Sequence, residues 1–239
     1  MWICLLLLSL LSCIDRTHPF CPAVNCSTRS NMDTEIKRSI QLLFEESGRD
    51  DSHGLCHAEA VAANSEIILS KLAGSTGSIA ADELPQMGKL VASVALLHDV
   101  SDHKYDPEGK MMGKMREILS SFFSSEEVQL VMDIIERMSY SKENKAILKG
   151  LPLDWEEKLG PQGCLVRDIV SDADKLEAIG LIGVERCLEY TKETNPGFDE
   201  RQCVEQLVAH SKEKLFRLKD EFIRTAPGKE LAAPLHEEM

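Results

Sequence analysis

The sequence predicts an all-α protein, and two observations support this fold class. Hydrophobic residues make up 43% of the 239 residues but aromatic residues only 5%. A chain rich in Leu, Ala, Glu and Lys favours helices over strands, which prefer β-branched and aromatic residues. Apolar residues also recur three and four positions apart along much of the chain, the period of a helix with one buried face. We therefore expect a helical bundle.

The expected domain organisation is one domain over residues 32–239, preceded by a segment at residues 1–31. A core of this size needs no disulfide staples. Eight cysteines occur without a Cys-x-x-Cys pair, a pattern typical of small buried hydrophobes in a reducing compartment. The net charge of −13 argues against a nucleic-acid backbone as the main partner, but it permits a small phosphate ester held through a metal.

Two interpretations compete for residues 1–31. Met1–Ser12 is an apolar run that resembles a signal-peptide core but is shorter than the ~20 residues of a membrane-spanning helix. The alternative is an extension upstream of a working start at Met32, which precedes the acidic turn of Asp33 and Glu35, suited to a helix N-terminus. We favour the second, and so expect a cytoplasmic protein without a stable membrane span. The first would place it on the secretory route.

The first two helices are predicted from apolar stripes. Ile36, Ile40 and Leu43 share one face of a helix that the polar run 47–52 ends. A second helix starts near Leu55, and in it His57 shares the buried face. Residues 72–85, with two glycines and a proline, are expected to form a connection.

A third helix carries the most informative stretch of the sequence. In the apolar run Lys89–Leu97, Val91, Val94 and Ala95 lie on the same face as the following His98, and Asp99 comes next. A carboxylate beside an imidazole at the edge of a core needs a salt bridge, a hydrogen-bond network or a metal.

The second half of the chain is predicted in the same way. Helices are expected over residues 110–123, 125–138 and 198–222, a looser stretch over 140–163, and an irregular tail from Thr225 onward. A further helix places Val166, Val170, Ala173, Asp174, Ala178 and Leu181 inward. Asp174 interrupts that apolar stripe, which favours a ligand role. Asp172 must face elsewhere because positions i and i+2 diverge on a helix.

Four motifs together resemble those of the HD-domain superfamily of metal-dependent phosphohydrolases, and most resemble its small nucleotide pyrophosphohydrolase-like branch. The motifs are His53-x-x-x-His57, Leu96-Leu97-His98-Asp99-Val100-Ser101-Asp102-His103-Lys104-Tyr105, the stretch from Asp172 to Gly183, and the stretch from His210 to Asp220. The resemblance covers about Met32 to the C-terminus. Gly54 and Ala60 depart from the aspartate and arginine that many relatives have there.

The resemblance implies an HD-domain helical bundle with a metal site between helices and site residues in three roles. The implied metal ligands are His57, His98, Asp99 and Asp174. The implied catalytic residues are Asp102, which would orient or deprotonate the attacking water, and Lys104 and Lys175, which would neutralise phosphate charge. The implied substrate-binding residues are His53, His210 and Lys214.

Two imidazoles and two carboxylates suit a divalent ion, for which we expect Mn²⁺, with Co²⁺, Ni²⁺, Fe²⁺, Zn²⁺ and Mg²⁺ as alternatives. The partner expected from the resemblance is a phosphorylated small molecule, nucleotide-like, cleaved at a phosphoanhydride or phosphoester bond. Two other functions remain open at this point: an iron-dependent oxygenase of the same fold and a metal-stabilised helical binding module. The oligomeric state is left open.

Overall fold

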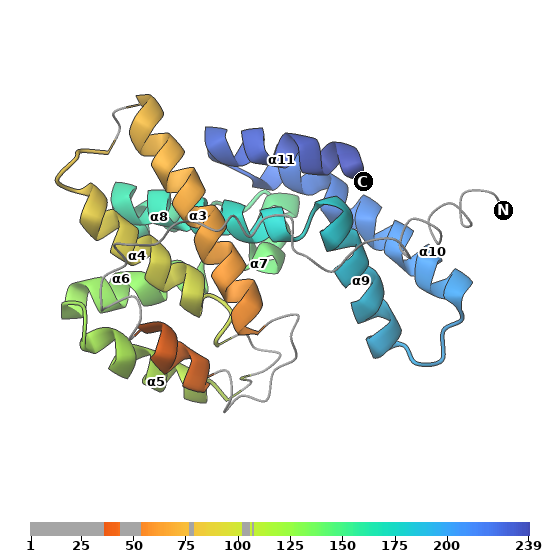
Figure 1. Cartoon of the computed structure of the whole chain (residues 1–239), viewed down its shortest axis with the longest axis horizontal. Helices are drawn as coiled ribbons and strands as arrows, with labels where there is room; N and C mark the ends of the chain where they lie inside the picture. The colour runs from red at the N-terminus through yellow and green to blue at the C-terminus, as the bar shows by residue number, and fades with distance from the viewer. Residues whose placement is uncertain (1–35, 44–53, 77–78, 102–105, 107) are drawn as a thin grey trace.

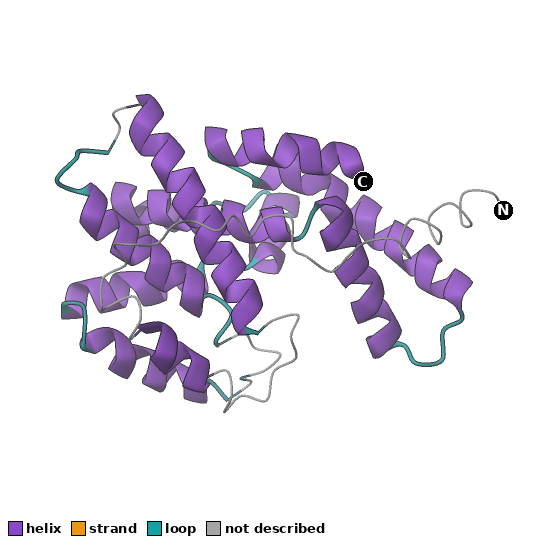
Figure 2. Cartoon of the chain, in the orientation of Figure 1, coloured by secondary structure: helices purple, strands orange, loops and turns teal. Residues whose placement is uncertain are grey.

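The computed structural model of the chain describes residues 36–43, 54–76, 79–101, 106 and 108–239. Every regular element within these ranges is a helix (Figure 2), which confirms the predicted all-α class. The expectations for residues 1–31 lie outside the described residues. No helix in the described ranges combines the length and apolarity that crossing a membrane requires.

Residues 36–43 form the first described helix. The helices that follow are α3 (Leu55–Thr76), α4 (Leu84–Leu97), α5 (Lys110–Ser120), α6 (Ser125–Glu136), α7 (Tyr140–Leu148), α8 (Trp155–Glu177), α9 (Gly180–Thr194), α10 (Glu200–His210) and α11 (Ala226–Glu238). Two π-helical turns, η2 (Ser211–Leu215) and η3 (Leu218–Phe222), continue α10 toward α11. The predicted helices at 110–123, 125–138 and 198–222 are thus present with slightly shifted ends.

The core is built around three helices that pack against one another: α3, α4 and α8. The α6 helix covers α4 and α8, and α5 packs on α6. In Figure 1, α9 and α10 extend to one side of this core, and α11 lies along α8 and α3. The largest fully buried side chains are those of Arg167 and Phe222, and aliphatic residues follow, among them Ile68, Leu90, Leu97, Ile134, Ile169 and Leu218.

The prediction of a looser stretch over residues 140–163 is wrong, because α7 and the start of α8 lie there. The Ser139 hydroxyl caps α7 by accepting a hydrogen bond from the Lys142 amide, a common helix start. The helical conformation of α8 is interrupted at Gly160, which has a φ of +62° and is followed by Pro161. This break interrupts the apolar period, which is why the sequence pattern hides the helix.

The prediction of an irregular tail from Thr225 onward is also wrong. Residues 226–238 form α11, in which Pro227 occupies the first turn, where its missing N–H costs nothing. Thr225 provides the cap, with its hydroxyl accepting a hydrogen bond from Gly228 N at 3.0 Å. Pro227 therefore fits the start of a helix, whereas Pro234 lies inside the helix without ending it.

Three smaller expectations also change. The connection at 72–85 is shorter than predicted, because α3 continues to Thr76. Leu181 is 49% exposed instead of inward-facing, because α8 ends before Gly180, whose φ of +78° turns the chain into α9. Cys56 is exposed, although Cys203 is buried as expected.

Candidate metal centre

Three helices that lie far apart in the sequence bring four of the predicted ligands together. His57 lies in the first turn of α3, His98 and Asp99 directly follow α4, and Asp174 lies near the end of α8. Since α3, α4 and α8 pack against one another, the four side chains converge at one edge of the core. We call His57, His98, Asp99 and Asp174 the His–Asp cluster.

The nitrogens and oxygens of the His–Asp cluster lie within a few ångströms of one another. His57 Nε2 is 3.3 Å from Asp174 Oδ1 and 3.8 Å from Asp99 Oδ2. His98 Nε2 is 3.5 Å from Asp99 Oδ1 and 3.7 Å from Asp174 Oδ1. The two imidazole rings meet edge to face with centroids 5.4 Å apart. Ligand atoms of one ion, each about 2.0–2.2 Å from it, would show such separations.

One hydrogen bond fixes the orientation of His98. Its Nδ1 lies 2.8 Å from the carbonyl oxygen of Ala95, so Nδ1 carries the proton and donates it. Nε2 is then the nitrogen that presents a lone pair to the cluster. A histidine held in this way by a backbone carbonyl is typical of metal ligands.

The neighbouring histidines favour an ionised Asp174. The side chains of His57 and His98 are almost fully buried, whereas that of Asp174 is 41% exposed, so the cluster opens to solvent on the Asp174 side. Partial burial raises the pKa of Asp174, but the hydrogen bond from His57 and the neighbouring His98 outweigh it and hold the pKa well below its usual range. Metal ligation requires the deprotonated carboxylate.

The donor set of the His–Asp cluster fits a divalent ion. Each of His57, His98 and Asp99 offers an atom within 4.8 Å of the others, and Asp174 lies against both histidines. Mixed nitrogen and oxygen donors suit Mn²⁺, Fe²⁺, Co²⁺, Ni²⁺ or Zn²⁺. The arrangement leaves the choice among these ions open.

The other predicted site residues are either outside the described residues or not part of the His–Asp cluster. His53, Asp102 and Lys104 fall outside the described residues. Lys175 adjoins Asp174, but its ammonium donates to the Ser171 hydroxyl within the core. Its catalytic role therefore stays a prediction.

His210 and Lys214 lie on α10 and η2, and both are half-buried. Burial and the charge of Lys214 lower the pKa of His210. The Lys214 ammonium lies 4.9 Å from the centre of the Tyr140 ring. None of the contacts described for these two residues reaches the His–Asp cluster, and their substrate-binding role is not tested.

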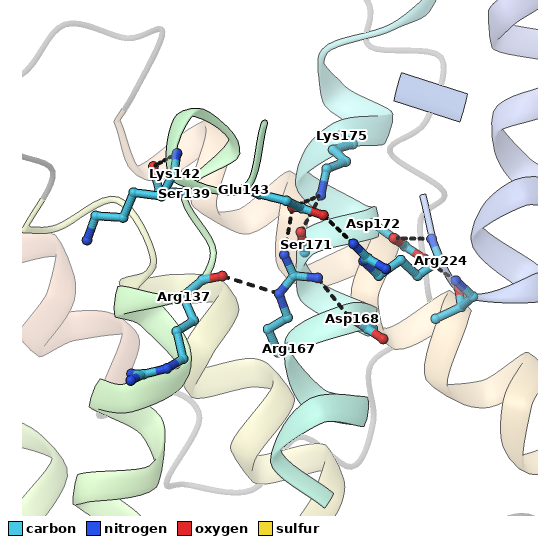
Figure 3. A network of polar contacts seen from close by, with 11 residues as sticks. Arg137, Ser139, Lys142, Glu143, Arg167, Asp168, Ser171, Asp172, Lys175 and Arg224 are labelled. Carbon is cyan, nitrogen blue, oxygen red and sulfur yellow. Dashed lines mark hydrogen bonds and ion pairs between the residues drawn. The ribbon is translucent and has the colours of Figure 1, made fainter. Parts of the chain in front are cut away.

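Sequence reasoning missed a buried ionic network beside the His–Asp cluster (Figure 3). Glu143 of α7 has a side chain that is only 1% exposed, and it meets cations from two other segments. Arg167 Nη2 donates to its Oε2 at 2.8 Å, and Arg224 Nη2 donates to its Oε1 at 2.5 Å. Lys175 Nζ lies 3.8 Å from Oε2. We call Glu143, Arg167, Lys175 and Arg224 the Glu143 network.

The Glu143 network offsets the cost of burying its charges by pairing them. Burial raises the pKa of Glu143, but Lys175, Arg167 and Arg224 outweigh it and lower the pKa below its usual value. The guanidinium of Arg167 also lies 3.5 Å from the centre of the Trp155 ring, a favourable cation–π contact. Glu143 interrupts no apolar stripe in the sequence, and a single acidic residue in a polar stretch gives no signal that could have revealed the network.

Comparisons with known proteins show which fold the chain has. No family model matches the chain. An uncharacterised protein of Bacillus subtilis, YpgQ, is 32% identical over 151 residues, a match that spans 62% of this chain and 65% of YpgQ. A crystal structure of YpgQ in complex with ADP has a TM-score of 0.56 at 23% identity and covers 87% of this chain and 91% of its own.

A crystal structure from Bacillus thuringiensis decides the fold. It is described as an HD-superfamily hydrolase, is 25% identical, has a TM-score of 0.57 and covers 87% of this chain and 92% of its own. The chain has the HD-superfamily fold. This agrees with the resemblance carried by the sequence motifs, whereas the pyrophosphohydrolase-like branch remains an expectation.

Proposed function

We propose that this protein is a metal-dependent phosphohydrolase that cleaves a phosphoanhydride or phosphoester bond of a nucleotide-like substrate. The observation that carries the proposal is the convergence of His57, His98, Asp99 and Asp174 from three separate helices. Two kinds of relative support it: an HD-superfamily hydrolase of the same fold and YpgQ, which was crystallised with ADP.

The four residues of the His–Asp cluster would hold one divalent ion, with Mn²⁺ as the expected metal. A divalent metal supplies a hydroxide at neutral pH and polarises a phosphoryl oxygen, which are the services that phosphate hydrolysis needs. Residues of the chain orient the metal ligands and leave one side of the site open. Ala95 orients His98 through Nδ1, and the exposed side of Asp174 gives water and substrate access.

Two further residues would act on the substrate in this proposal. Asp102 would orient or deprotonate the attacking water, and Lys104 would neutralise phosphate charge during hydrolysis. Both follow Asp99 within five residues, which places them close to the cluster along the chain. The substrate would be bound on the side where Asp174 is exposed.

The proposal predicts Mn²⁺-dependent release of phosphate or pyrophosphate from a panel of ribo- and deoxyribonucleoside triphosphates. The assay would use the full chain stripped of metal and then reloaded, with bound metal measured by elemental analysis. His98→Ala and Asp174→Ala should each lose both the ion and the activity. Asp168→Asn is the matched control, because Asp168 lies on the same helix as Asp174 but pairs with Arg167.

Two results would contradict the proposal. Full hydrolysis by Asp174→Ala would remove the His–Asp cluster from the reaction. Metal binding by the unchanged protein without release of phosphate or pyrophosphate from any nucleotide would favour the metal-stabilised binding module. Oxygen consumption with an iron-loaded sample would instead favour the oxygenase.

A further inference from the structure

Lys175 occupies an unusual position beside the His–Asp cluster. It directly follows Asp174 in α8, yet it is only 4% exposed. Its ammonium donates to the Ser171 hydroxyl and lies 3.8 Å from Glu143 Oε2 (Figure 3). The side chain is thus directed toward Glu143 of α7.

Glu143 is held rigidly enough to fix this direction. Arg167 and Arg224 each donate to a different oxygen of its carboxylate, so the group has little freedom to rotate. Both bonds involve charged groups and are buried or partly buried, which makes them stronger than ordinary neutral hydrogen bonds. Glu143 therefore presents a fixed negative charge to Lys175.

Without Glu143, the Lys175 ammonium would be a buried charge that lacks its carboxylate, and it would turn toward another one. Asp172 is poorly placed to accept it, because the amides of Arg224 and Thr225 donate to its two oxygens at 2.9 and 2.7 Å. Asp174 is the adjacent residue, and adjacent residues of α8 can pair, as Arg167 and Asp168 do at 2.8 Å. Asp174 is therefore the favoured alternative partner.

We propose that Glu143 is a positioning residue for the metal centre, because it holds the Lys175 ammonium away from the Asp174 carboxylate. An ammonium paired with Asp174 would compete with a divalent ion for the same oxygens. The inference rests on the proposed metal-binding role of the His–Asp cluster. It adds a residue of α7, a helix that supplies none of the four ligands.

The test is a double-mutant cycle on Mn²⁺ affinity, measured by titration calorimetry on the metal-stripped full chain. Glu143→Gln should weaken Mn²⁺ binding by about 10- to 100-fold, the usual effect of residues that orient metal ligands. Lys175→Met alone should leave the affinity close to that of the unchanged protein. The double variant should recover most of the loss, because the competing ammonium is gone.

Glu205→Gln is the matched control for charge. It makes the same chemical change at a residue of α10 that pairs with Arg201 at 2.8 Å, away from the Glu143 network, so Mn²⁺ affinity should stay near that of the unchanged protein. A loss as large as that of Glu143→Gln would mean that overall charge is responsible, which would overturn the proposal. Failure of Lys175→Met to rescue Glu143→Gln would overturn it as well.

The outcomes separate this inference from the proposed function. Absence of Mn²⁺ binding by the unchanged protein would overturn both, whereas normal Mn²⁺ binding by Glu143→Gln would overturn the inference alone. If Glu143→Gln does not fold, Glu143→Asp replaces it, because aspartate keeps the buried charge but reaches less far. A folded Glu143→Asp protein with full Mn²⁺ affinity would then overturn the inference.

Discussion

At the scale of single residues, hydrogen bonds join Ser101, which follows the ligand pair, to Asp106 and to the start of α5. The Ser101 hydroxyl donates to Asp106 Oδ2 at 3.3 Å. Asp106 is buried and also accepts hydrogen bonds from the amides of Lys110 and Met111, each at 2.8 Å. Asp106 therefore ties the chain just after Asp99 to the start of α5. Asp102 and Lys104 come between Ser101 and Asp106 in the sequence.

The two residues should respond differently to substitution. Asp102→Asn should retain bound metal and lose on the order of 10² to 10⁴ in kcat, the usual contribution of a general base. Lys104→Ala should mainly raise KM, because a phosphate contact made in both ground and transition states contributes uniform binding. Steady-state kinetics on the two metal-loaded variants measures this difference. Unchanged kcat and KM in both would remove the pair from the mechanism.

At the scale of elements, α11 is held onto the metal-ligand helix α8 through very close contacts. Asp172 of α8 is fully buried and accepts the amides of Arg224 and Thr225, just before α11. A Cβ atom on Gly228, in the first turn of α11, would lie 2.6 Å from Asp172 Oδ2 and 2.8 Å from Thr225 Oγ1. Only glycine allows this approach.

Gly228→Ala should therefore lower the free energy of unfolding, by about 1–3 kcal/mol if it breaks the hydrogen bonds to Asp172. Gly113→Ala is the matched control, because Gly113 lies in α5 with no atom within 4 Å of the added Cβ. There, alanine should stabilise the helix by about 0.5–1 kcal/mol. Urea unfolding of the two variants measures both effects, and equal stability of Gly228→Ala and the unchanged protein would contradict the close docking.

The elements that could be predicted from the sequence are those with an uninterrupted apolar stripe, such as α4 and α6. The four residues of the His–Asp cluster were predicted for a related reason, because His98 and Asp174 interrupt such stripes and the motifs around them resemble those of a family. The α7 helix was missed because few of its residues are apolar, and α11 was missed because it contains Pro227 and Pro234. The Glu143 network could not be predicted, because its charges become partners only when three separate segments meet.

At the scale of the whole molecule, the described core is assembled from residues 36 onward. The helix at residues 36–43 contributes Ile36, Ile40 and Leu43, all at most 5% exposed, to the same hydrophobic core as α3, α4 and α8. Without this helix the free energy of unfolding would lose the burial of these three side chains, about 1.5–3 kcal/mol for each. We therefore expect a chain that lacks this helix to be less stable.

A shortened protein that begins at Met32 should fold and hydrolyse substrate as well as the full chain. It keeps the helix at residues 36–43 and the acidic turn before it, and the motif resemblance also begins at about Met32. Thermal melts and Mn²⁺-dependent hydrolysis by the two proteins measure the comparison, with a protein that begins at Leu43 as the control. That control should be less stable, because it lacks Ile36 and Ile40. Insolubility of the Met32 protein, or recovery of a glycosylated full chain outside cells, would instead favour the secretory interpretation of residues 1–31.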